Sequence, residues 1–249
     1  MLRMLILQTF IFSLAFSASN AFKIAQKAYD VEDGKDIQAT MHMKIHTRSG
    51  QVKERTIEVS RKDYGKDNRA LFKFKAPALV KGSAFLTWNF KDKDDNDLWL
   101  YLPALKKVRR IASSDKHKSF MGSDYSYEDM SKRNLKKDTF KFIKEENHNK
   151  VACNVIEASS KDKDEKIKKR KVWIRKDNNL VVKALFYDKK GKIIKELITG
   201  GIKKIQNIWT ITESTMKNVE KGTKTTLNLS DVKYNNGLSD RLFSHRTKK

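Results

Sequence analysis

The sequence predicts a mainly β protein, organised as one antiparallel sheet or barrel. Short runs of β-branched and aromatic residues recur at nearly regular spacing, and many of them alternate between apolar and polar positions. Short polar turns separate these runs, as is typical of antiparallel all-β folds. No internal boundary or repeat is visible in the 249 residues, so the sequence predicts one domain.

The first residues are predicted to form a secretory signal. A short basic start precedes the largely apolar stretch 4–18, and the small residues Ser19 and Ala21 fit the positions before a cleavage site. The apolar stretch is shorter than the ~20 residues that a membrane-spanning helix needs. We predict a signal peptide over residues 1–21, cleaved after Ala21, and a single domain over residues 22–249.

The first part of this domain alternates with the period of a strand. Residues 22–31 are expected to form a short amphipathic helix that ends at Asp33-Gly34. From residue 37 onward, apolar side chains recur at every second position. The expected strands cover 37–46, 52–61, 70–75 and 84–90, with a hairpin turn at 48–51 and a loop at 63–68.

The stretch Asp97–Pro103 is apolar on both faces and too short for an ordinary helix. A strand of this kind is covered on both sides, or it lines a cavity on one of them, and we favour the cavity. A basic strand is expected next, over 106–111. A mixed segment with aromatic residues, a glycine and acids follows over 120–130.

Later segments repeat the strand pattern. A hairpin is expected around 147–149, and the charge run 161–171 is expected to be a long solvated turn. The chain closes with one expected helical turn over 236–243. The other expected strands cover 139–143, 151–158, 172–175, 180–187, 193–198, 202–214 and 223–234.

Large and adaptable side chains dominate the expected inward positions. Small closed barrels mix small and large residues, so a small barrel filled by these side chains would be overpacked. A wide, open and curved sheet would instead offer an apolar wall, and Met and aromatic residues suit irregular acyl chains. An ordinary sandwich core remains the alternative, because periodicity does not separate the two. The expected lipid-cavity residues are Met41, Met43, Phe72, Phe74, Leu86, Trp88, Phe90, Trp99 and Tyr101.

The sequence offers no recognisable catalytic or metal site. His42 and His46 share a strand face, but four residues along a strand span roughly 13 Å, too far to ligate one metal together. Ser123 lacks the nucleophile-elbow pattern around it. Cys153 is the single cysteine, which excludes an internal disulfide and favours a small buried side chain. We predict a non-enzyme without catalytic residues, metal or cofactor.

The chain is strongly basic, with 54 Lys and Arg against 30 Asp and Glu and a formal net charge of +24. This charge favours nucleic acid, anionic lipid headgroups or acidic proteins as partners, although a lysine-rich source organism would give the same composition. Because an exported protein does not meet DNA, we expect no nucleic-acid partner. The expected contacts to headgroups or a partner are Lys106, Lys107, Arg109 and Arg110.

Four parts of the chain carry motifs that point to one known family. Three of them are Gly34-Lys35-Asp36 with Met41-His42-Met43, Phe74-Lys75-Ala76-Pro77 with 81–86, and 98–103 with 108–111. The fourth and most specific part joins Phe120-Met121-Gly122-Ser123-Asp124 to Tyr127-Glu128-Asp129, and the chain end around 234–243 is also similar. Together they resemble the outer membrane lipoprotein-sorting, LolA-like family of exported carriers, and the similarity is greatest to its largely uncharacterised branch that is associated with membrane transporters.

This resemblance implies a single incomplete antiparallel β-barrel, lidded by short helices, with an apolar cavity for acyl chains. It implies a periplasmic carrier that binds lipid or lipoprotein and passes it between membranes or membrane proteins without catalysis. The implied partners are this cargo, an inner-membrane transporter or outer-membrane acceptor, and an anionic membrane surface. We match the charged latch of the family's lid to no residue here. We place a movable flap at the cavity mouth, formed by Phe120, Met121, Gly122 and Ser123.

Two other classes of protein fit parts of the pattern. An integral outer-membrane β-barrel also has alternating strands, but the outward faces here carry lysines such as Lys44 and Lys73, and the chain ends in Thr247-Lys248-Lys249 instead of an aromatic residue. A secreted enzyme acting on lipid or cell-wall material would need a nucleophile or a metal site. Solubility without detergent would distinguish a carrier from an integral outer-membrane barrel. Turnover of substrates in an ester or glycan panel would identify a secreted enzyme.

Overall fold

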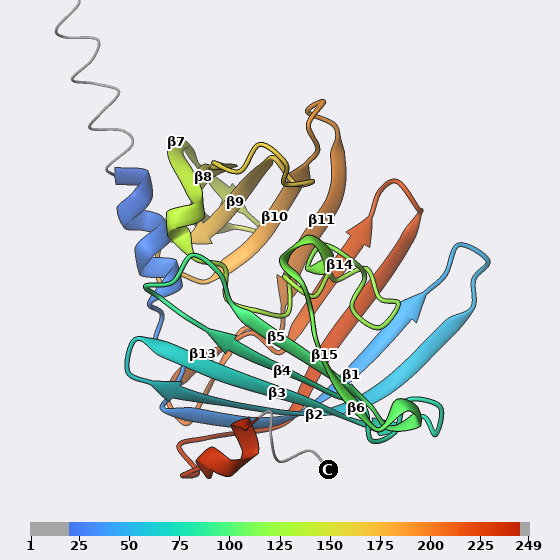
Figure 1. Ribbon diagram of the computed structural model, residues 1–249. Coiled ribbons are helices and arrows are strands. Elements are labelled where there is room, and N and C mark those ends of the chain that lie inside the picture. Colours follow the sequence, from blue (N-terminus) through green and yellow to red (C-terminus); the bar gives the residue numbers. More distant parts are fainter. Residues whose placement is uncertain (1–19, 245–249) are drawn as a thin grey trace, which may run out of the picture. The chain divides into compact units, whose positions relative to one another are not determined.

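The computed structural model of the protein describes residues 20–244, which form a mainly β structure (Figure 1). This confirms the prediction of a mainly β protein. The chain divides into two compact units, and their described parts are residues 20–31 with Leu135–Ile198 and Glu32–Asn134 with residues 199–244. The single-domain organisation stays a prediction. The predicted signal peptide lies outside the described residues, except for its last two positions.

Unit one is a row of antiparallel strands with a helix against it. The helix covers residues 20–29, close to the expected range, and it buries Ala21 and Ala25 in a cluster with Ile156 and Ile174. The strands lie in the order β11-β10-β9-β8-β7. Their bounds are β7 Asp138–His148, β8 Val151–Ser160, β9 Lys169–Arg175, β10 Val181–Tyr187 and β11 Ile193–Gly200, and the short helix η3 covers Leu135–Lys137.

Unit two is a longer antiparallel row in which the first and last strands of the unit are neighbours. Its order is β6-β5-β4-β3-β2-β1-β15-β14. A separate hairpin is formed by β12 (Lys203–Ile205) and β13 (Ile208–Thr210). The other bounds are β1 Asp36–His46, β2 Val52–Tyr64, β3 Asp67–Ala76, β4 Ala84–Asn89, β5 Asp97–Leu102, β6 Lys107–Arg110, β14 Glu213–Asn218, β15 Thr223–Tyr234, η1 Pro103–Leu105, η2 Ser113–Asp115 and η4 Asp240–Phe243.

The expected barrel is only partly supported by these rows. Within residues 20–244, the neighbouring strands inside each of the two rows pair antiparallel, as predicted. However, β6 in unit two and β7 in unit one each pair with one neighbour, so neither strand closes a barrel. The antiparallel sheet is therefore established, and the incomplete barrel remains a proposal.

Two expected connections are wrong in detail. The strand predicted over 202–214 is broken into β12, β13 and the start of β14, because Gln206 and Asn207 adopt left-handed φ angles of 48° and 65° and form a tight turn. The loop predicted over 63–68 is mostly strand, because β2 and β3 are joined at Gly65-Lys66. In both places the chain reverses in a short turn, where the composition favours a long strand (202–214) or a longer loop (63–68).

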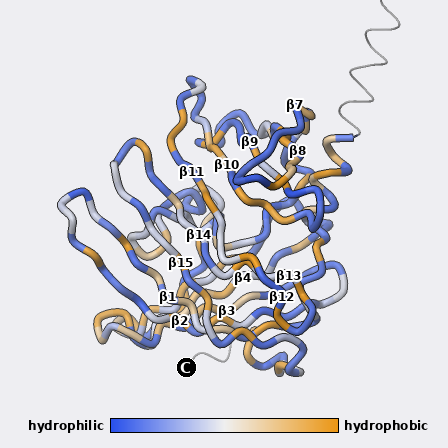
Figure 2. The backbone as a smooth tube through the Cα atoms, turned by 180° about the vertical axis from the view of Figure 1, so that it is seen from behind, coloured by the Kyte–Doolittle hydropathy of each residue, from blue (hydrophilic) through white to orange (hydrophobic). Residues whose placement is uncertain are grey.

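The strand register divides the core of unit two into two faces. Side chains of directly paired residues lie on the same side of a sheet, and neighbours along a strand lie on opposite sides. Phe72 pairs with Phe85, and Leu71 pairs with Leu86, so these two pairs occupy opposite faces. Figure 2 shows hydrophobic positions interspersed with hydrophilic ones along the strands.

We name the two faces after the residues that cover them. The Phe120 face comprises Met41, Met43, Ile57, Phe72, Phe74, Phe85, Leu98 and Leu100. The Phe243 face comprises Leu71, Ala84, Leu86, Trp88, Trp99 and Tyr101.

Candidate functional site

Phe120 lies at the centre of an aromatic cluster on the Phe120 face. Its ring centroid is 5.1 Å from that of Phe85, 5.9 Å from Phe74 and 6.2 Å from Phe72, and the side chain is fully buried. Tyr127, from the same segment as Phe120, adds a ring at 5.7 Å. Aromatic pairs at these separations add favourable ring contacts to the burial of apolar area. The segment that carries Phe120 therefore packs against β3 and β4.

A tight turn presents Phe120 to the sheet. Met121 and Gly122 adopt left-handed φ angles of 50° and 81°, and the Ser123 N–H donates to the Phe120 carbonyl at 2.9 Å. The Phe120 N–H donates to the Tyr125 carbonyl at 2.7 Å, which closes the base of the turn. Glycine adopts such a φ without steric cost, which explains its place in the Met-Gly-Ser sequence.

A buried polar contact holds this turn against β15. The Asp124 carboxylate accepts hydrogen bonds from the hydroxyl groups of Thr223, at 2.5 Å, and Thr225, at 2.8 Å. Asp124 is 8% exposed and Thr225 is fully buried. A carboxylate in such a place needs bonded partners, because its desolvation costs several kcal/mol. Figure 1 shows this segment as the green loop in front of β14 and β15.

A second contact joins the segment to β14. The hydroxyl groups of Tyr125 and Ser214 lie 2.9 Å apart and share a hydrogen bond. Burial raises the pKa of Tyr125 well above its ordinary value, so the phenol stays protonated. We call the contacts of Asp124 and Tyr125 with β14 and β15 the Asp124 latch.

The Phe243 face is covered by the end of the chain. The Phe243 side chain is fully buried against Leu71 and Leu86, and its carbonyl accepts a hydrogen bond from the Trp88 Nε1 at 2.9 Å. Leu238 and Leu242 pack beside it. The expected helical turn at the chain end is confirmed as η4.

Asp36 fixes the start of this closing segment. Its carboxylate accepts backbone N–H bonds from Asn236 at 2.8 Å, Gly237 at 2.9 Å and Leu238 at 3.1 Å. The side chain is 3% exposed, so these three donors replace the water that it loses on folding. The Gly-Lys-Asp motif and the chain end, two of the parts that carried the resemblance, therefore meet in space.

The nine expected lipid-cavity residues do not share one surface, so the expectation of a single lining is wrong. Strand alternation and register separate them, since β3 and β4 are apolar on both sides. Phe90 lies beyond the end of β4, where the Lys93 Nζ lies 3.8 Å from its ring centroid. The Phe120 face carries Met41, Met43, Phe72 and Phe74, and the Phe243 face carries Leu86, Trp88, Trp99 and Tyr101.

The four expected flap residues form the turn over the Phe120 face. Phe120 and Ser123 are buried, Met121 is half-buried and Gly122 is exposed. The Ser123 hydroxyl donates to the Tyr125 carbonyl at 3.3 Å. The structure thus shows these residues packed closely on the sheet, and their movement stays a prediction.

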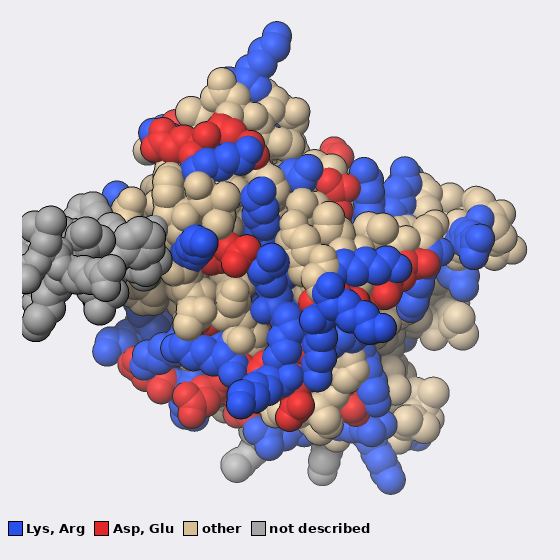
Figure 3. Space-filling model, turned by 90° about the horizontal axis from the view of Figure 1, so that it is seen from above, with Lys and Arg blue, Asp and Glu red and all other residues tan. Residues whose placement is uncertain are grey.

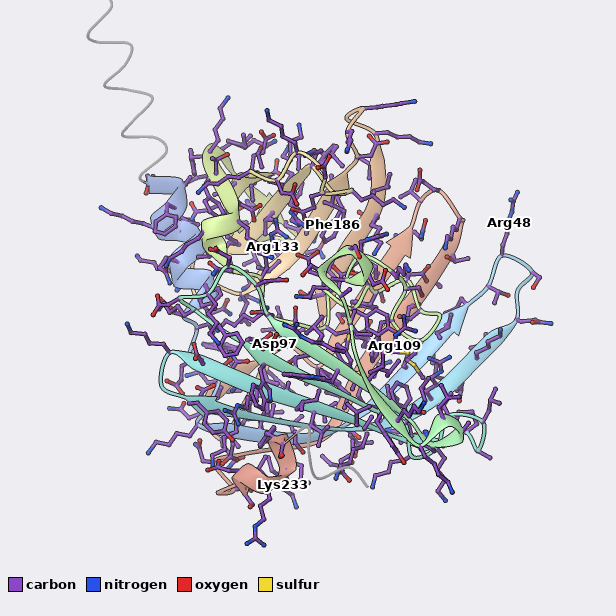
Figure 4. All side chains as sticks on the ribbon, in the orientation of Figure 1. Arg48, Asp97, Arg109, Arg133, Phe186 and Lys233 are labelled. Carbon is purple, nitrogen blue, oxygen red and sulfur yellow. The ribbon has the colours of Figure 1, made fainter. Side chains whose placement is uncertain are left out.

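The four expected contact residues lie at the edge of unit two. All of β6 is exposed, and Lys106 precedes it in the left-handed region. Arg110 forms an ion pair with Asp97 on the neighbouring strand β5. The side chain of Arg109 lies on the opposite side of β6, and Figure 4 labels both Arg109 and Asp97. Leu105 and Val108 are also exposed here, at 63% and 37%. Figure 3 shows Lys and Arg side chains spread over the face in view.

Within residues 20–244, no group of three or more potential metal ligands occurs, and no helix has the length and apolarity needed to cross a membrane. Cys153 is buried in β8, as expected, and burial raises the pKa of its thiol. The described side chains thus supply a packed apolar face, a cover for it and a basic edge.

Sequence reasoning missed the partners of two acids. Asp124 is visible in the sequence as an acid, but its partners Thr223 and Thr225 lie about a hundred residues further along the chain. Asp36 and Gly237 are separated by 201 positions. The local signals were an acid directly after Gly-Ser and alternating threonines in a strand, and neither identifies its partner.

The chain is similar to known proteins in sequence and in fold. A family model described as an uncharacterized protein matches residues 66–247, and comparison with curated proteins gave no match. The structure is similar to that of a DUF1329 family protein from Desulfovibrio piger, with a TM-score of 0.86 and 33% sequence identity over 94% of this chain and 99% of that one.

Two further crystal structures are similar to this chain. An outer membrane lipoprotein-sorting protein domain from Vibrio parahaemolyticus has a TM-score of 0.86 and 33% identity, over 91% of this chain and 97% of that one. The LolA superfamily protein NE2245 from Nitrosomonas europaea has a TM-score of 0.70 and 19% identity, over 90% and 97%. The chain therefore belongs to the family of DUF1329 and outer membrane lipoprotein-sorting proteins, and it has the fold of the LolA superfamily.

Proposed function

We propose that the protein is a periplasmic carrier that binds the acyl chains of lipid or lipoprotein and passes them between membranes or membrane proteins without catalysis. The single observation that carries this proposal is the Phe120 face, an apolar sheet face covered by a short segment of the chain. Membership of a lipoprotein-sorting family supports the same role.

The acyl chain lies on the Phe120 face in this proposal. Burying acyl chains is favourable by about 0.8 kcal/mol per methylene group, so an apolar face gives affinity without specific polar contacts. Met41 and Met43 adapt to irregular chains, and the rings of Phe72, Phe74 and Phe85 offer wide apolar contact. The Phe243 face is closed by the chain end and serves stability.

The Phe120 segment acts as the flap. It crosses the apolar face without belonging to a strand of the row, and the Asp124 latch gives it a small number of polar contacts with β14 and β15. Opening this latch would remove Phe120 from the aromatic cluster and free the face for cargo. We propose that the closed, latched segment is the unloaded form.

The basic edge faces membranes or protein partners. Lys106, Lys107, Arg109 and Arg110 attract anionic headgroups, and the exposed Leu105 at the end of η1 adds an apolar contact. The donor and acceptor in this role are an inner-membrane transporter and an outer-membrane acceptor. The predicted export places the carrier in the periplasm, with the mature chain beginning after Ala21.

The test is native mass spectrometry of the mature protein, purified from a periplasmic extract without detergent. We expect a co-purifying mass of lipid or acylated protein, which is lost when Phe85 is changed to Asp. The matched control is the Leu86→Asp change at the neighbouring position of the opposite face, and the folded state of both variants is checked by circular dichroism. A wild-type protein that carries no such mass and binds no fluorescent fatty acid would refute the carrier.

A further inference from the structure

Arg55 is a cation on the Phe120 face. It pairs in register with Met43, which is fully buried, so the two side chains leave the sheet on the same side. The Arg55 Cζ lies 5.9 Å from the centroid of the Phe74 ring. The guanidinium therefore stands at the border of the aromatic cluster.

Within residues 20–244, the Arg55 guanidinium has no ion pair, and its buried Nη1 has no hydrogen-bond partner. The carboxylates nearest to it along the strand are engaged elsewhere: Glu54 binds Lys44 and Glu58 binds Lys75, both at 3.0 Å. Burial lowers the pKa of Arg55, and no carboxylate offsets this effect. A buried N–H without an acceptor is rare in native proteins and costs stability.

The flap turn lies directly beside this guanidinium. A Cβ at Gly122 would lie 4.0 Å from the Arg55 Nη2 and would meet no other atom at that distance. The turn that holds Phe120 in the aromatic cluster thus also borders the unpaired cation. A ligand that displaces Phe120 from the face would bring its polar end within reach of Arg55.

We propose that Arg55 binds the terminal oxyanion, a carboxylate or phosphate, of an amphiphile whose acyl chain lies on the Phe120 face. The planar guanidinium matches the two oxygens of such a group and gives the buried Nη1 its missing acceptor. This inference rests on the proposed carrier function, and it adds the requirement that the cargo is anionic next to its chain. A neutral amphiphile would leave Arg55 unpaired.

The test compares dodecanoate, dodecyl phosphate, neutral dodecanol and inorganic phosphate as ligands of the full mature chain by calorimetry. The wild type is expected to bind both acyl anions about tenfold more tightly than dodecanol. Arg55→Met removes this preference and leaves the affinity for dodecanol unchanged, and Arg55→Lys retains part of it. The control is Arg48→Met, since Arg48 is exposed and points away from the sheet at the β1–β2 turn (Figure 4).

The outcomes separate the two levels of the proposal. If Arg55→Met keeps the preference for anions, or if inorganic phosphate binds as tightly as dodecyl phosphate, the Arg55 site is refuted while the carrier function stands. If the wild type binds none of the acyl ligands, the carrier function fails and the Arg55 site fails with it. Because the change removes an unpaired cation, Arg55→Met is expected to keep the melting temperature of the wild type, which confirms that the variant is folded.

Discussion

Asp124 and Thr225 form a reciprocal pair. The Asp124 backbone N–H donates to the Thr225 Oγ1 at 2.9 Å, and the Thr225 hydroxyl donates to the Asp124 carboxylate at 2.8 Å. Both residues are buried, so neither bond is exchanged readily for one with water. This pair is the central contact of the Asp124 latch.

Changing Thr225 to Val keeps the shape of the side chain and removes both hydrogen bonds. We expect the free energy of unfolding to fall by about 1–3 kcal/mol, because the buried carboxylate of Asp124 loses a donor. Weakening of the latch should also raise the association rate of a fluorescent acyl probe in stopped-flow measurements. Thr225→Ser keeps the hydroxyl and should restore both values, and an unchanged probe rate in Thr225→Val would argue against the latch.

Phe85 and Leu86 provide a test of the two faces, because they are neighbours in β4 and both almost fully buried. Changing either residue to Ala should lower stability by about 2–5 kcal/mol through cavity formation. Only Phe85→Ala should weaken acyl binding, because Phe85 contacts Phe120 while Leu86 packs against Phe243. Denaturant unfolding and probe titration measure the two effects separately. Equal losses of affinity would mean that the faces do not differ in function.

Asp36→Asn should destabilise the end of the chain. The amide keeps the size of the side chain but offers only one acceptor oxygen, and without charge, to the three backbone N–H groups of 236–238. We expect a loss of about 1–3 kcal/mol, with faster hydrogen exchange at these three amides. Exchange at 123–125 serves as the internal control, because that turn is held by a different acid.

Tyr64 should make stability depend on alkaline pH. Burial, the hydrogen bond to Asp240 at 2.8 Å and the charge of Asp240 raise its pKa from 10.0 to about 12. Since the folded state holds this proton more tightly than the unfolded state, the contribution is complete below pH 10 and is lost as the pH rises toward 12. Tyr64→Phe should remove this part of the alkaline decline, measured by urea unfolding at several pH values. Superimposable curves for the two proteins would contradict the assignment.

The basic edge should control membrane contact. Changing Lys106, Lys107, Arg109 and Arg110 together to Gln should weaken binding to vesicles that contain phosphatidylglycerol by up to about 4 kcal/mol at low salt, close to a thousandfold, since each charge near the surface contributes about 1 kcal/mol. The difference should shrink as salt rises, because screening removes the attraction. Cosedimentation measures the binding, with four exposed lysines of unit one, Lys141, Lys150, Lys163 and Lys190, as the matched control.

Much of the fold follows from the sequence alone. Period-two alternation correctly predicted β1, with Met41 and Met43 buried, and the apolar run 97–103 correctly predicted a strand, while the cavity that we favoured on one side of it stays a prediction. These elements were predictable because the residues that decide them lie within a few positions of each other. The turn at Gln206-Asn207 was missed because its left-handed backbone carries no glycine.

The candidate site was less predictable, for a physical reason. In β4 the side chains of Phe85 and Leu86 are both buried, so alternation does not reveal which of them shares a face with Phe72. That relation depends on the register with β3. The Asp124 latch likewise depends on a distant strand, β15. In the local sequence, Asp124 looks like an ordinary turn residue and Thr225 like an ordinary strand residue.

The adjacency of β1 and β15 also governs how unit two is made. β1 is synthesised before its neighbour β15, so one edge of β1 has no partner strand until residues 223–234 are made. The carboxylate of Asp36 likewise lacks its three N–H donors until residues 236–238 are made. Contacts so distant in sequence form late. The growing chain therefore has no complete unit two until residues 223–238 have been made, because these residues supply the partners of β1 and Asp36.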